Sequence, residues 1–279
     1  MPIVEPHVFQ ARWYLNGFPK SGLHWVSLMM QAIAEMTPEL DEVFSKPWAG
    51  TFARNSWTNE WVPAEKWAYK ASLLHPGEFM YSHCGHNADV ERFLWLCGMA
   101  HIFIYRDLRD VAVSQAYHVT NEDNERFAHP EKEIYIDLLK SGGIGEVIKA
   151  CIAGIDKYPG VVERWEQYAG WLGVDWVLKV RFEELAADTK EVARRILRFG
   201  LARSASVFGA RLHVNQNVFE YIAETMVNYG NMKQKSPTFR KGAMGDWREH
   251  FTPEITALFK EHDPNGWLRR LGYEQSDEW

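Results

Sequence analysis

Residues 18–25 combine a cation, a hydroxyl group and a glycine just before a predicted helix, in the sequence Phe-Pro-Lys-Ser-Gly-Leu-His-Trp. Backbone amides at a helix N-terminus have no partner within the helix, and the helix dipole adds a partial positive charge there. Gly22 permits a tight turn and the close approach of an anion, while Lys20 and Ser21 add side-chain donors. The combination suits a phosphate or sulfate group, although an ordinary strand-to-helix turn explains the segment equally well when it is taken alone. It is not the nucleoside-triphosphate loop, in which Lys follows the second Gly as Gly-Lys-Ser/Thr.

A second charged segment follows the most apolar strand that the sequence predicts, residues 100–105. It runs from Arg106 to Ser114 as Arg-Asp-Leu-Arg-Asp-Val-Ala-Val-Ser. Ligands of open α/β sheets bind beyond the carboxyl ends of the strands, and an arginine there can fork two hydrogen bonds to a phosphate. Ser114 lies about two helical turns further on. For Arg109 and the two aspartates of this segment, surface ion pairs are the alternative interpretation.

A third segment, residues 239–247, places two adjacent cations before a pair of glycines, as Phe-Arg-Lys-Gly-Ala-Met-Gly-Asp-Trp. A loop of this kind can wrap an anion with backbone amides as well as with the side chains of Arg240 and Lys241. Taken alone, the segment is equally well explained as a solvated turn.

These segments need a scaffold, and the sequence predicts one in which strands and helices alternate. Apolar and aromatic runs bounded by turn residues predict strands, and apolar residues at helical spacing predict helices. Residues 120–173 are predicted to be mostly helical, with a break at residues 141–143. The alternation indicates a single α/β domain over residues 1–279, with a parallel sheet covered by helices on both faces. The predicted strands are residues 12–18, 78–83, 100–105 and 175–181, and the predicted helices are residues 22–36, 88–97, 110–118 and 189–199.

The composition is that of a globular protein, with 46% hydrophobic and 24% charged residues, which excludes a disordered chain, a collagen-like fibre and a coiled-coil rod. The net charge of −6 does not favour nucleic-acid binding, since proteins that bind phosphate backbones are usually basic. The three cysteines lack metal-finger spacing and predict no disulfide framework, which indicates a reducing compartment. The first residues lack a secretory pattern, and the longest apolar stretch, residues 93–105, is shorter than the roughly 20 residues that span a bilayer. We therefore expect a cytoplasmic protein that binds neither nucleic acid nor membrane.

Together and in this order, the segments resemble those of the PAPS-dependent sulfotransferases of the cytosolic type, where PAPS is 3′-phosphoadenosine 5′-phosphosulfate. The first resembles the family's 5′-phosphosulfate loop, Pro-Lys-Ser-Gly-Thr-Thr-Trp, and the second its 3′-phosphate motif, Arg-Asp-Pro-Arg-Asp-Val-Ala-Val-Ser. The third resembles Arg-Lys-Gly-x-x-Gly-Asp-Trp, and residues 180–185 resemble the family's Arg-Tyr-Glu-Asp-Leu strand end. The resemblance extends from residue 12 to about residue 262. It implies a P-loop nucleotide-binding fold and transfer of a sulfuryl group from PAPS to a hydroxyl acceptor, with release of PAP.

The resemblance also implies a role for each segment. Lys20 is expected to contact the 5′-phosphosulfate and its bridging oxygen, Trp25 to stack on adenine, and Phe182 to replace an adenine-contacting Tyr. The remaining nucleotide contacts are expected from Ser21, Gly22, Leu23 and His24 at the 5′ group and from Arg106, Ser114, Arg240, Lys241 and Gly242 at the 3′-phosphate.

The catalytic base implied by the resemblance is His83, because the family places its histidine at the end of this strand. A neutral imidazole can take the proton of the acceptor hydroxyl as oxygen attacks sulfur. His86, three residues later, is the competing candidate. Lys20 shares the catalytic role by neutralising the leaving phosphate oxygen. The family generally needs no metal, and no metal-ligand cluster stands out in the sequence.

The chain departs from the family pattern at several positions. Leu23 and His24 stand where relatives have two Thr, so one side-chain donor is lost and the other is replaced by an imidazole. Tyr81 stands where a Lys often precedes the catalytic histidine.

Aromatic residues concentrate in residues 44–69, the stretch that covers the acceptor pocket in the family. An apolar pocket excludes water and protects the sulfuryl group from hydrolysis. The candidate acceptor-binding residues are Trp48, Phe52, Tyr81, Tyr117 and His118. The sequence leaves open whether the acceptor is a phenol, a steroid, a lipid, a sugar or a carrier-bound hydroxyl.

Two other functions remain as alternatives. A nucleotide kinase on a related P-loop scaffold should carry Gly-Lys-Ser/Thr, which this chain lacks. A non-catalytic PAP-binding module would bind the nucleotide without turnover.

Overall fold

The computed structural model describes residues 11–35, 48–49, 71–75, 77–121, 132–156, 158–208, 214–232 and 240–279. Contacts between its residues divide the chain into two compact units. Among the described residues, the first unit holds those up to Tyr105 and those from Ala169 to residue 232. The second holds Arg106 to Tyr168 and Arg240 onward. A single domain over residues 1–279 stays a prediction, and each unit is described by itself.

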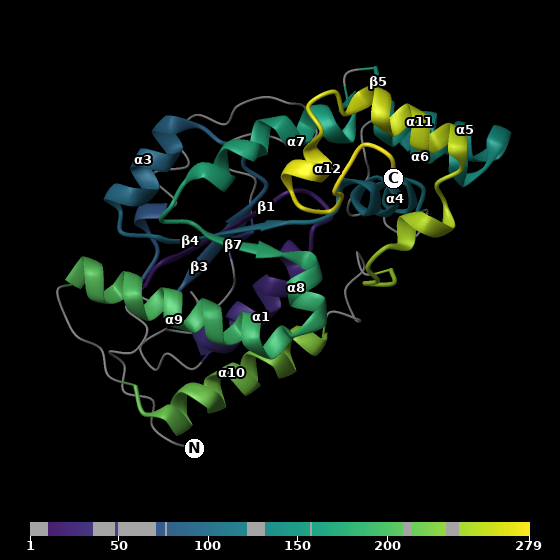
Figure 1. Cartoon of the computed structure of the whole chain (residues 1–279). Coiled ribbons are helices and arrows are strands. Elements are labelled where there is room, and N and C mark those ends of the chain that lie inside the picture. The colour runs from purple at the N-terminus through teal and green to yellow at the C-terminus, as the bar shows by residue number, and fades with distance from the viewer. Residues whose placement is uncertain are drawn as a thin grey trace. The chain divides into compact units, whose positions relative to one another are not determined.

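The first unit contains a five-stranded sheet in the order β2-β3-β1-β4-β7. All of its pairings are parallel, with Trp13 of β1 opposite both Phe79 and Ala100. Parallel neighbours require crossover connections, and helices supply them. The predicted α/β fold with a parallel sheet flanked by helices is therefore confirmed (Figure 1). The strands are β1 (Trp13–Gly17), β2 (Trp48–Ala49), β3 (Phe79–Ser82), β4 (Ala100–Tyr105) and β7 (Leu178–Arg181).

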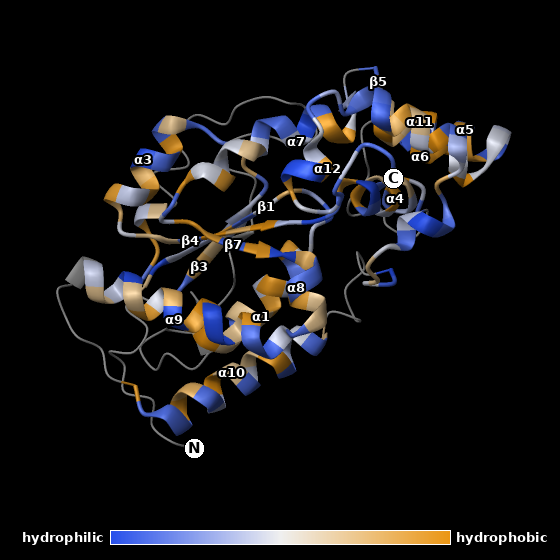
Figure 2. Cartoon of the chain, viewed as in Figure 1, coloured by the Kyte–Doolittle hydropathy of each residue, from blue (hydrophilic) through white to orange (hydrophobic). Residues whose placement is uncertain are grey.

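Three helices cover one face of this sheet. Alternate strand residues, among them Trp13, Leu15 and Ile102, form one apolar cluster with the inner sides of α1, α9 and α10. Figure 1 shows these helices on the same side of the sheet, and Figure 2 shows hydrophobic residues along β4 and β7. The helices of this unit are α1 (Leu23–Glu35), α3 (Ala88–Leu96), the 3-10 helix η3 (Gly170–Gly173), α8 (Phe182–Ala187), α9 (Thr189–Phe208) and α10 (Gln216–Gly230).

The opposite face of the sheet is buried but partly polar. The Tyr14 hydroxyl lies 2.6 Å from the Ser82 hydroxyl, which ties β1 to β3. The Tyr14 ring also lies 4.7 Å from the ring of His101, which packs edge-on against Trp171 of η3. β1 is buried along its whole length, and both ring nitrogens of His101 are buried without a hydrogen-bond partner in the described part of the chain.

The predicted elements all form, most of them with shifted ends. Asn87 caps α3 by accepting from the amides of Asp89 and Val90. The helix predicted over residues 189–199 continues to Phe208, with Gly200 inside it and packed against the Trp13 ring. Any side chain at Gly200 would collide with that ring.

The second unit is mainly helical. α6 packs against α4, α5 and α11, and the predicted break between helices falls at Gly143, which has a φ of +76°. No helix in the described part of the chain is long and apolar enough to cross a membrane. The elements of this unit are α4 (Leu108–Val119), α5 (Lys132–Gly142), α6 (Ile144–Ala153), β5 (Gly154–Ile155), β6 (Tyr158–Pro159), α7 (Val161–Ala169), the 3-10 helix η5 (Asp246–Glu249), α11 (Pro253–His262) and α12 (Trp267–Arg270).

Candidate active site

The loop between β1 and α1 turns sharply before the helix begins. The amide of Phe18 donates to the carbonyl oxygen of Ile104 at 2.9 Å, which fixes the loop to the end of β4. Lys20 has a φ of +66° and Gly22 a φ of +93°, so the chain enters the left-handed region twice within three residues. The amide of Ser21 donates to the carbonyl oxygen of Phe18 at 3.2 Å, which closes the turn before the helix.

Ser21 supplies the clearest polar group of this loop. Ser21 is 0% exposed, and its hydroxyl has no hydrogen-bond partner within the described structure. A buried hydroxyl without a partner is costly and normally serves a ligand or ordered water. The group lies directly before the first turn of α1, where the helix amides begin.

The two residues that depart from the family pattern have opposite environments. Leu23 is buried, while the His24 side chain is exposed. The partial burial that His24 does have lowers its pKa from the usual 6.5. His24 therefore lies at the surface of α1, where its imidazole is accessible to a ligand.

Trp25 and Phe182, both predicted to contact the nucleotide, lie together in the first unit. Their ring centroids are 6.0 Å apart in an edge-on arrangement, and both residues are buried. A side chain at Gly22 would come within 2.8 Å of the Phe182 ring. Gly22 is therefore required both by its positive φ and by this packing.

His83 follows the last residue of β3 and is half-buried. Its Nδ1 atom lies 2.7 Å from the carbonyl oxygen of Gly17. A carbonyl oxygen only accepts, so Nδ1 carries the hydrogen of the neutral ring and Nε2 carries the lone pair. Since Gly17 is the last residue of β1, the candidate base is fixed to the strand that leads into the Lys20 loop.

The neighbouring backbone of Cys84 is held by Asn16. The Asn16 side chain accepts from the Cys84 amide and donates to its carbonyl oxygen, each at 2.9 Å. The Trp171 indole donates to the same carbonyl oxygen, also at 2.9 Å. Asn16 is 0% exposed, so this clamp is buried beside His83.

The competing histidine, His86, is engaged elsewhere. Its Nε2 atom lies 2.8 Å from the Glu91 carboxylate, and its ring packs edge-on against Trp171. This arrangement gives His86 a structural role at the start of α3.

Arg106 belongs to the second unit and is buried at 5% exposure. Its guanidinium donates to the carbonyl oxygen of Ala243 at 2.6 Å and lies 3.3 Å from the Asp110 carboxylate. Asp110 in turn accepts from the amides of Gly245 and Trp247 at 2.8 and 3.0 Å. The start of α4 therefore anchors the loop that carries Arg240 and Lys241.

Ion pairs form in this segment, as the alternative interpretation has it, but they are buried and do not lie at the surface. Arg109 is 1% exposed and its guanidinium binds Asp107 and Glu274 at 2.7 and 2.5 Å. The Asp107 and Glu274 contacts raise the pKa of Arg109 against the opposing effect of burial. The guanidinium also lies 3.8 Å from the Trp247 ring centroid, so apolar packing and ion pairing both stabilise the loop.

Arg240 and Lys241 share one carboxylate. Asp246 accepts from Arg240 and, at 2.8 Å, from the Lys241 ammonium, while the Arg240 guanidinium lies 4.4 Å from the Tyr117 ring centroid. Burial raises the pKa of Asp246, but the Lys241 and Arg240 contacts outweigh it and the pKa is lowered overall. Gly242, with a φ of +61°, lets the loop turn directly after the two cations.

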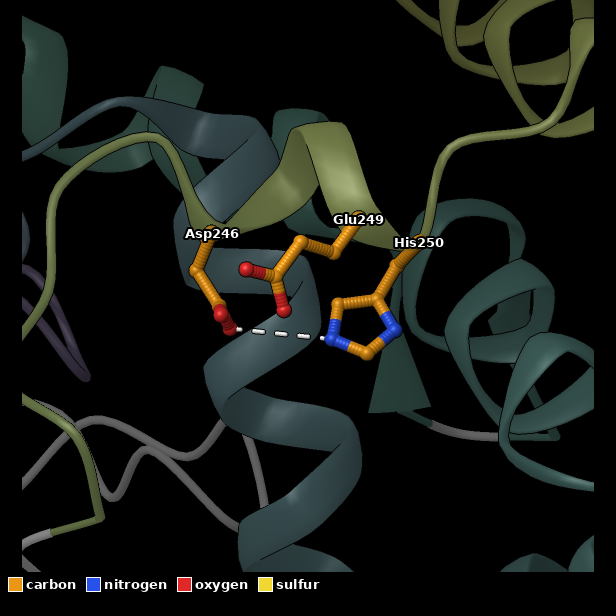
Figure 3. A group of neighbouring side chains, drawn as sticks. All are labelled: Asp246, Glu249 and His250. Atoms are coloured by element: carbon orange, nitrogen blue, oxygen red, sulfur yellow. Dashed lines mark ion pairs between the residues drawn. The ribbon is translucent and has the colours of Figure 1, made fainter.

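Asp246, Glu249 and His250 point toward one another, with the His250 Nε2 atom 3.7 Å from Asp246 (Figure 3). Their ligand atoms lie within 4.8 Å of one another, a spacing that a metal ion could bridge. Asp246 is already neutralised by two cations, which disfavours a further cation there.

The remaining predicted site residues lie on α4, on β3 or outside the described part of the chain. Ser114, Tyr117 and His118 are half-buried residues of α4, and the Tyr117 ring packs edge-on against His250. Tyr81, on β3, is half-buried, and burial raises the pKa of its hydroxyl. Phe52 and the side chain of Trp48 lie outside the described residues.

Comparison with known proteins decides the family. The family model for the sulfotransferase domain matches residues 12–263 of this chain. The chain belongs to the sulfotransferase family. The flavonol 4′-sulfotransferase of Flaveria chlorifolia is 24% identical over 278 residues, covering 91% of this chain and 79% of that protein. Sulfotransferase 1E1 of Cavia porcellus is 26% identical over 168 residues, covering 58% of this chain and 52% of that protein.

Two solved structures share the fold. A mouse sulfotransferase complexed with PAP superposes with a TM-score of 0.54 at 20% identity, covering 94% of this chain and 87% of that one. Retinol dehydratase in a complex with retinol and PAP gives a TM-score of 0.51 at 15% identity, covering 94% and 81%.

Three residues of this sulfotransferase were not assigned a functional role from the sequence: Asn16, Asp110 and Asp246. Of the three, only Asp110 could have been found from the sequence. It lies one helical turn after Arg106, so the two residues share a helix face. Nothing in the sequence pairs Asn16 with Cys84.

Proposed function

We propose that this protein transfers the sulfuryl group of PAPS to an acceptor hydroxyl, with His83 as the general base. The observation that carries the proposal is the hydrogen bond from His83 Nδ1 to the Gly17 carbonyl oxygen, because it leaves the lone pair on Nε2. The similar mouse sulfotransferase and retinol dehydratase were both solved in complexes with PAP, which supports the same nucleotide here.

The first unit offers donors suited to the 5′-phosphosulfate. Three features favour an anion at this loop: the buried Ser21 hydroxyl, which has no partner among the described residues, the positive φ of Lys20 and Gly22, and the start of α1. Leu23 and His24 supply helix amides, and Trp25 and Phe182 supply the aromatic surface expected to contact adenine.

The second unit offers donors suited to the 3′-phosphate. Arg106 is buried and held in place at the start of α4, and Arg240 and Lys241 are held by a single carboxylate. Ser114 and Gly242 complete the set that the family resemblance assigns to this group. No metal is required by these groups, because cationic side chains supply the positive charge.

The proposed chemistry is an in-line displacement at sulfur. His83 Nε2 takes the proton of the acceptor hydroxyl as its oxygen bonds to sulfur, and the bond from sulfur to the bridging phosphate oxygen breaks. Lys20 neutralises the charge that develops on that oxygen. Catalysis then depends on positioning and charge stabilisation, as it does in phosphoryl transfer.

The acceptor is proposed to be a small-molecule or carrier-bound hydroxyl. Tyr81, Tyr117 and His118 are the described candidates for contacting it, with Trp48 and Phe52 as further candidates. All three cysteines are free thiols, which supports the cytoplasm as the place of action.

The test combines nucleotide binding with turnover. Calorimetry should detect PAP binding without magnesium, and mass spectrometry of a hydroxyl-compound panel incubated with PAPS should find a product heavier by one sulfuryl group. Binding of PAP with no product from any acceptor would favour the non-catalytic module. Binding of ATP in preference to PAP would favour the kinase.

A further inference from the structure

The two cations proposed for the 3′-phosphate are both occupied by a carboxylate of their own loop. Asp246 has a side chain only 2% exposed, and it pairs with Arg240 and with Lys241. The Lys241 ammonium also contacts Glu249 at 3.0 Å, and the Glu249 side chain is 68% exposed. In this state both cations bind the buried carboxylate, and Glu249 supplies a second negative charge at Lys241.

The arrangement holds the cations in place. The Arg240 guanidinium lies over the Tyr117 ring and binds Asp246 at one end, while its Nε atom is buried without a partner in the described structure. The guanidinium therefore retains a donor for a further acceptor. An ammonium has three donors, of which Lys241 directs two to carboxylates.

Resting on the proposed function, we infer that Asp246 is a positioning residue that competes with the 3′-phosphate for Arg240 and Lys241. When the phosphate binds, the two cations exchange their carboxylate partner for phosphate oxygens. When PAP leaves, the two cations bind Asp246 again. Their positive charges therefore contact a negatively charged group both with and without PAP.

This exchange lowers the affinity for the nucleotide. A carboxylate and a phosphate a few ångströms apart repel, and burial reduces the screening of that repulsion by water. Asp246 would thus limit how tightly the product PAP is held. Product release limits the turnover of many enzymes, so a built-in competitor favours rapid turnover.

The test compares PAP with AMP, which lacks the 3′-phosphate, by calorimetry on the full chain. The parent should bind PAP at least ten-fold more tightly than AMP. Asp246→Asn keeps the size and one acceptor oxygen but removes the charge, and should tighten PAP binding about ten-fold while leaving AMP binding unchanged. The matched control is Glu249→Gln, which removes the same charge from the same lysine at an exposed position and should change PAP affinity less than about three-fold.

The outcomes separate the inference from the proposed function. A parent protein that binds PAP no better than AMP overturns the 3′-phosphate site, and this inference with it. A parent that prefers PAP, with an Asp246→Asn variant that binds PAP equally or more weakly, overturns the inference alone. If the variant does not fold, a crystal structure of the parent with PAP decides. Separation of Asp246 from the Lys241 ammonium beyond about 4 Å supports the exchange, and retention of the pair overturns it.

Discussion

The Nδ1 atom of His83 lies 2.7 Å from the carbonyl oxygen of Gly17, the last residue of β1. Lys20, the residue proposed to stabilise the leaving group, lies three positions further along the same chain segment. The end of β1 therefore positions both the proposed base, His83, and the proposed leaving-group stabiliser, Lys20. Ligands of parallel sheets bind at such strand ends.

His83→Ala is expected to lower turnover by about 10²–10⁴-fold, because it removes the group that takes the acceptor proton. PAP affinity should stay within a few-fold, since His83 is not proposed to bind the nucleotide. His86→Ala is the matched control and should keep turnover, because its imidazole binds Glu91. Steady-state kinetics and calorimetry check both variants. An active His83→Ala beside an inactive His86→Ala would reassign the base.

Asn16→Ala is expected to lower kcat while leaving PAP affinity nearly unchanged, because the clamp on Cys84 positions the adjacent His83. Loss of both hydrogen bonds should also lower the free energy of unfolding by about 1–3 kcal/mol. Urea unfolding and steady-state kinetics measure the two effects. Loss of stability with an unchanged kcat would limit Asn16 to a structural role.

Arg106→Ala is expected to weaken PAP binding by roughly 1.5–3 kcal/mol, the range for hydrogen bonds to charged groups. Calorimetry with PAP and AMP measures this, and AMP affinity should not change. Arg248→Ala removes a cation from an exposed position of η5 and serves as the control. An Arg106→Ala variant that binds PAP as the parent does would refute the assignment.

We expect the buried His101 to make the folded state less stable in acid. Burial lowers its pKa well below 6.5, with a smaller contribution from the charges of Lys179 and His86. The folded state therefore keeps the ring neutral while the unfolded chain binds a proton below pH 6.5, so stability falls as the pH falls through that value. His101→Phe should flatten this dependence by up to about 1.4 kcal/mol per pH unit. Urea unfolding at pH 7.5 and 5.5 tests it, with the exposed His75→Gln as control; an unchanged slope in His101→Phe would contradict it.

His24→Ala is expected to weaken PAPS binding by roughly 1–2 kcal/mol, because the exposed imidazole replaces the hydroxyl donor that relatives place here. His24→Thr restores a hydroxyl and should keep the affinity within a few-fold. Equilibrium binding of PAPS measures both variants. Parental affinity in His24→Ala would show that the helix amides suffice.

Local patterns in the sequence predicted the elements and the order of the site segments. The apolar run at Ala100–Tyr105 forms the predicted strand without change of either end, because burial on both faces requires continuous apolar residues. The glycine at 143 separates two helices as predicted, since its positive φ ends the helical path. The family of the chain also follows from its sequence, because the segments that bind one ligand keep their residue types and order.

The contacts between distant segments were decided by the tertiary structure alone. Asp110 accepts from the amides of Gly245 and Trp247, and Asn16 binds the backbone of Cys84. Hydropathy and spacing describe only a residue's neighbours along the chain, whereas these hydrogen bonds depend on which polar groups folding removes from water together. A buried aspartate needs hydrogen-bond partners. Asp110, which the sequence alone allows to be read as part of a surface ion pair, therefore anchors a loop in the folded protein.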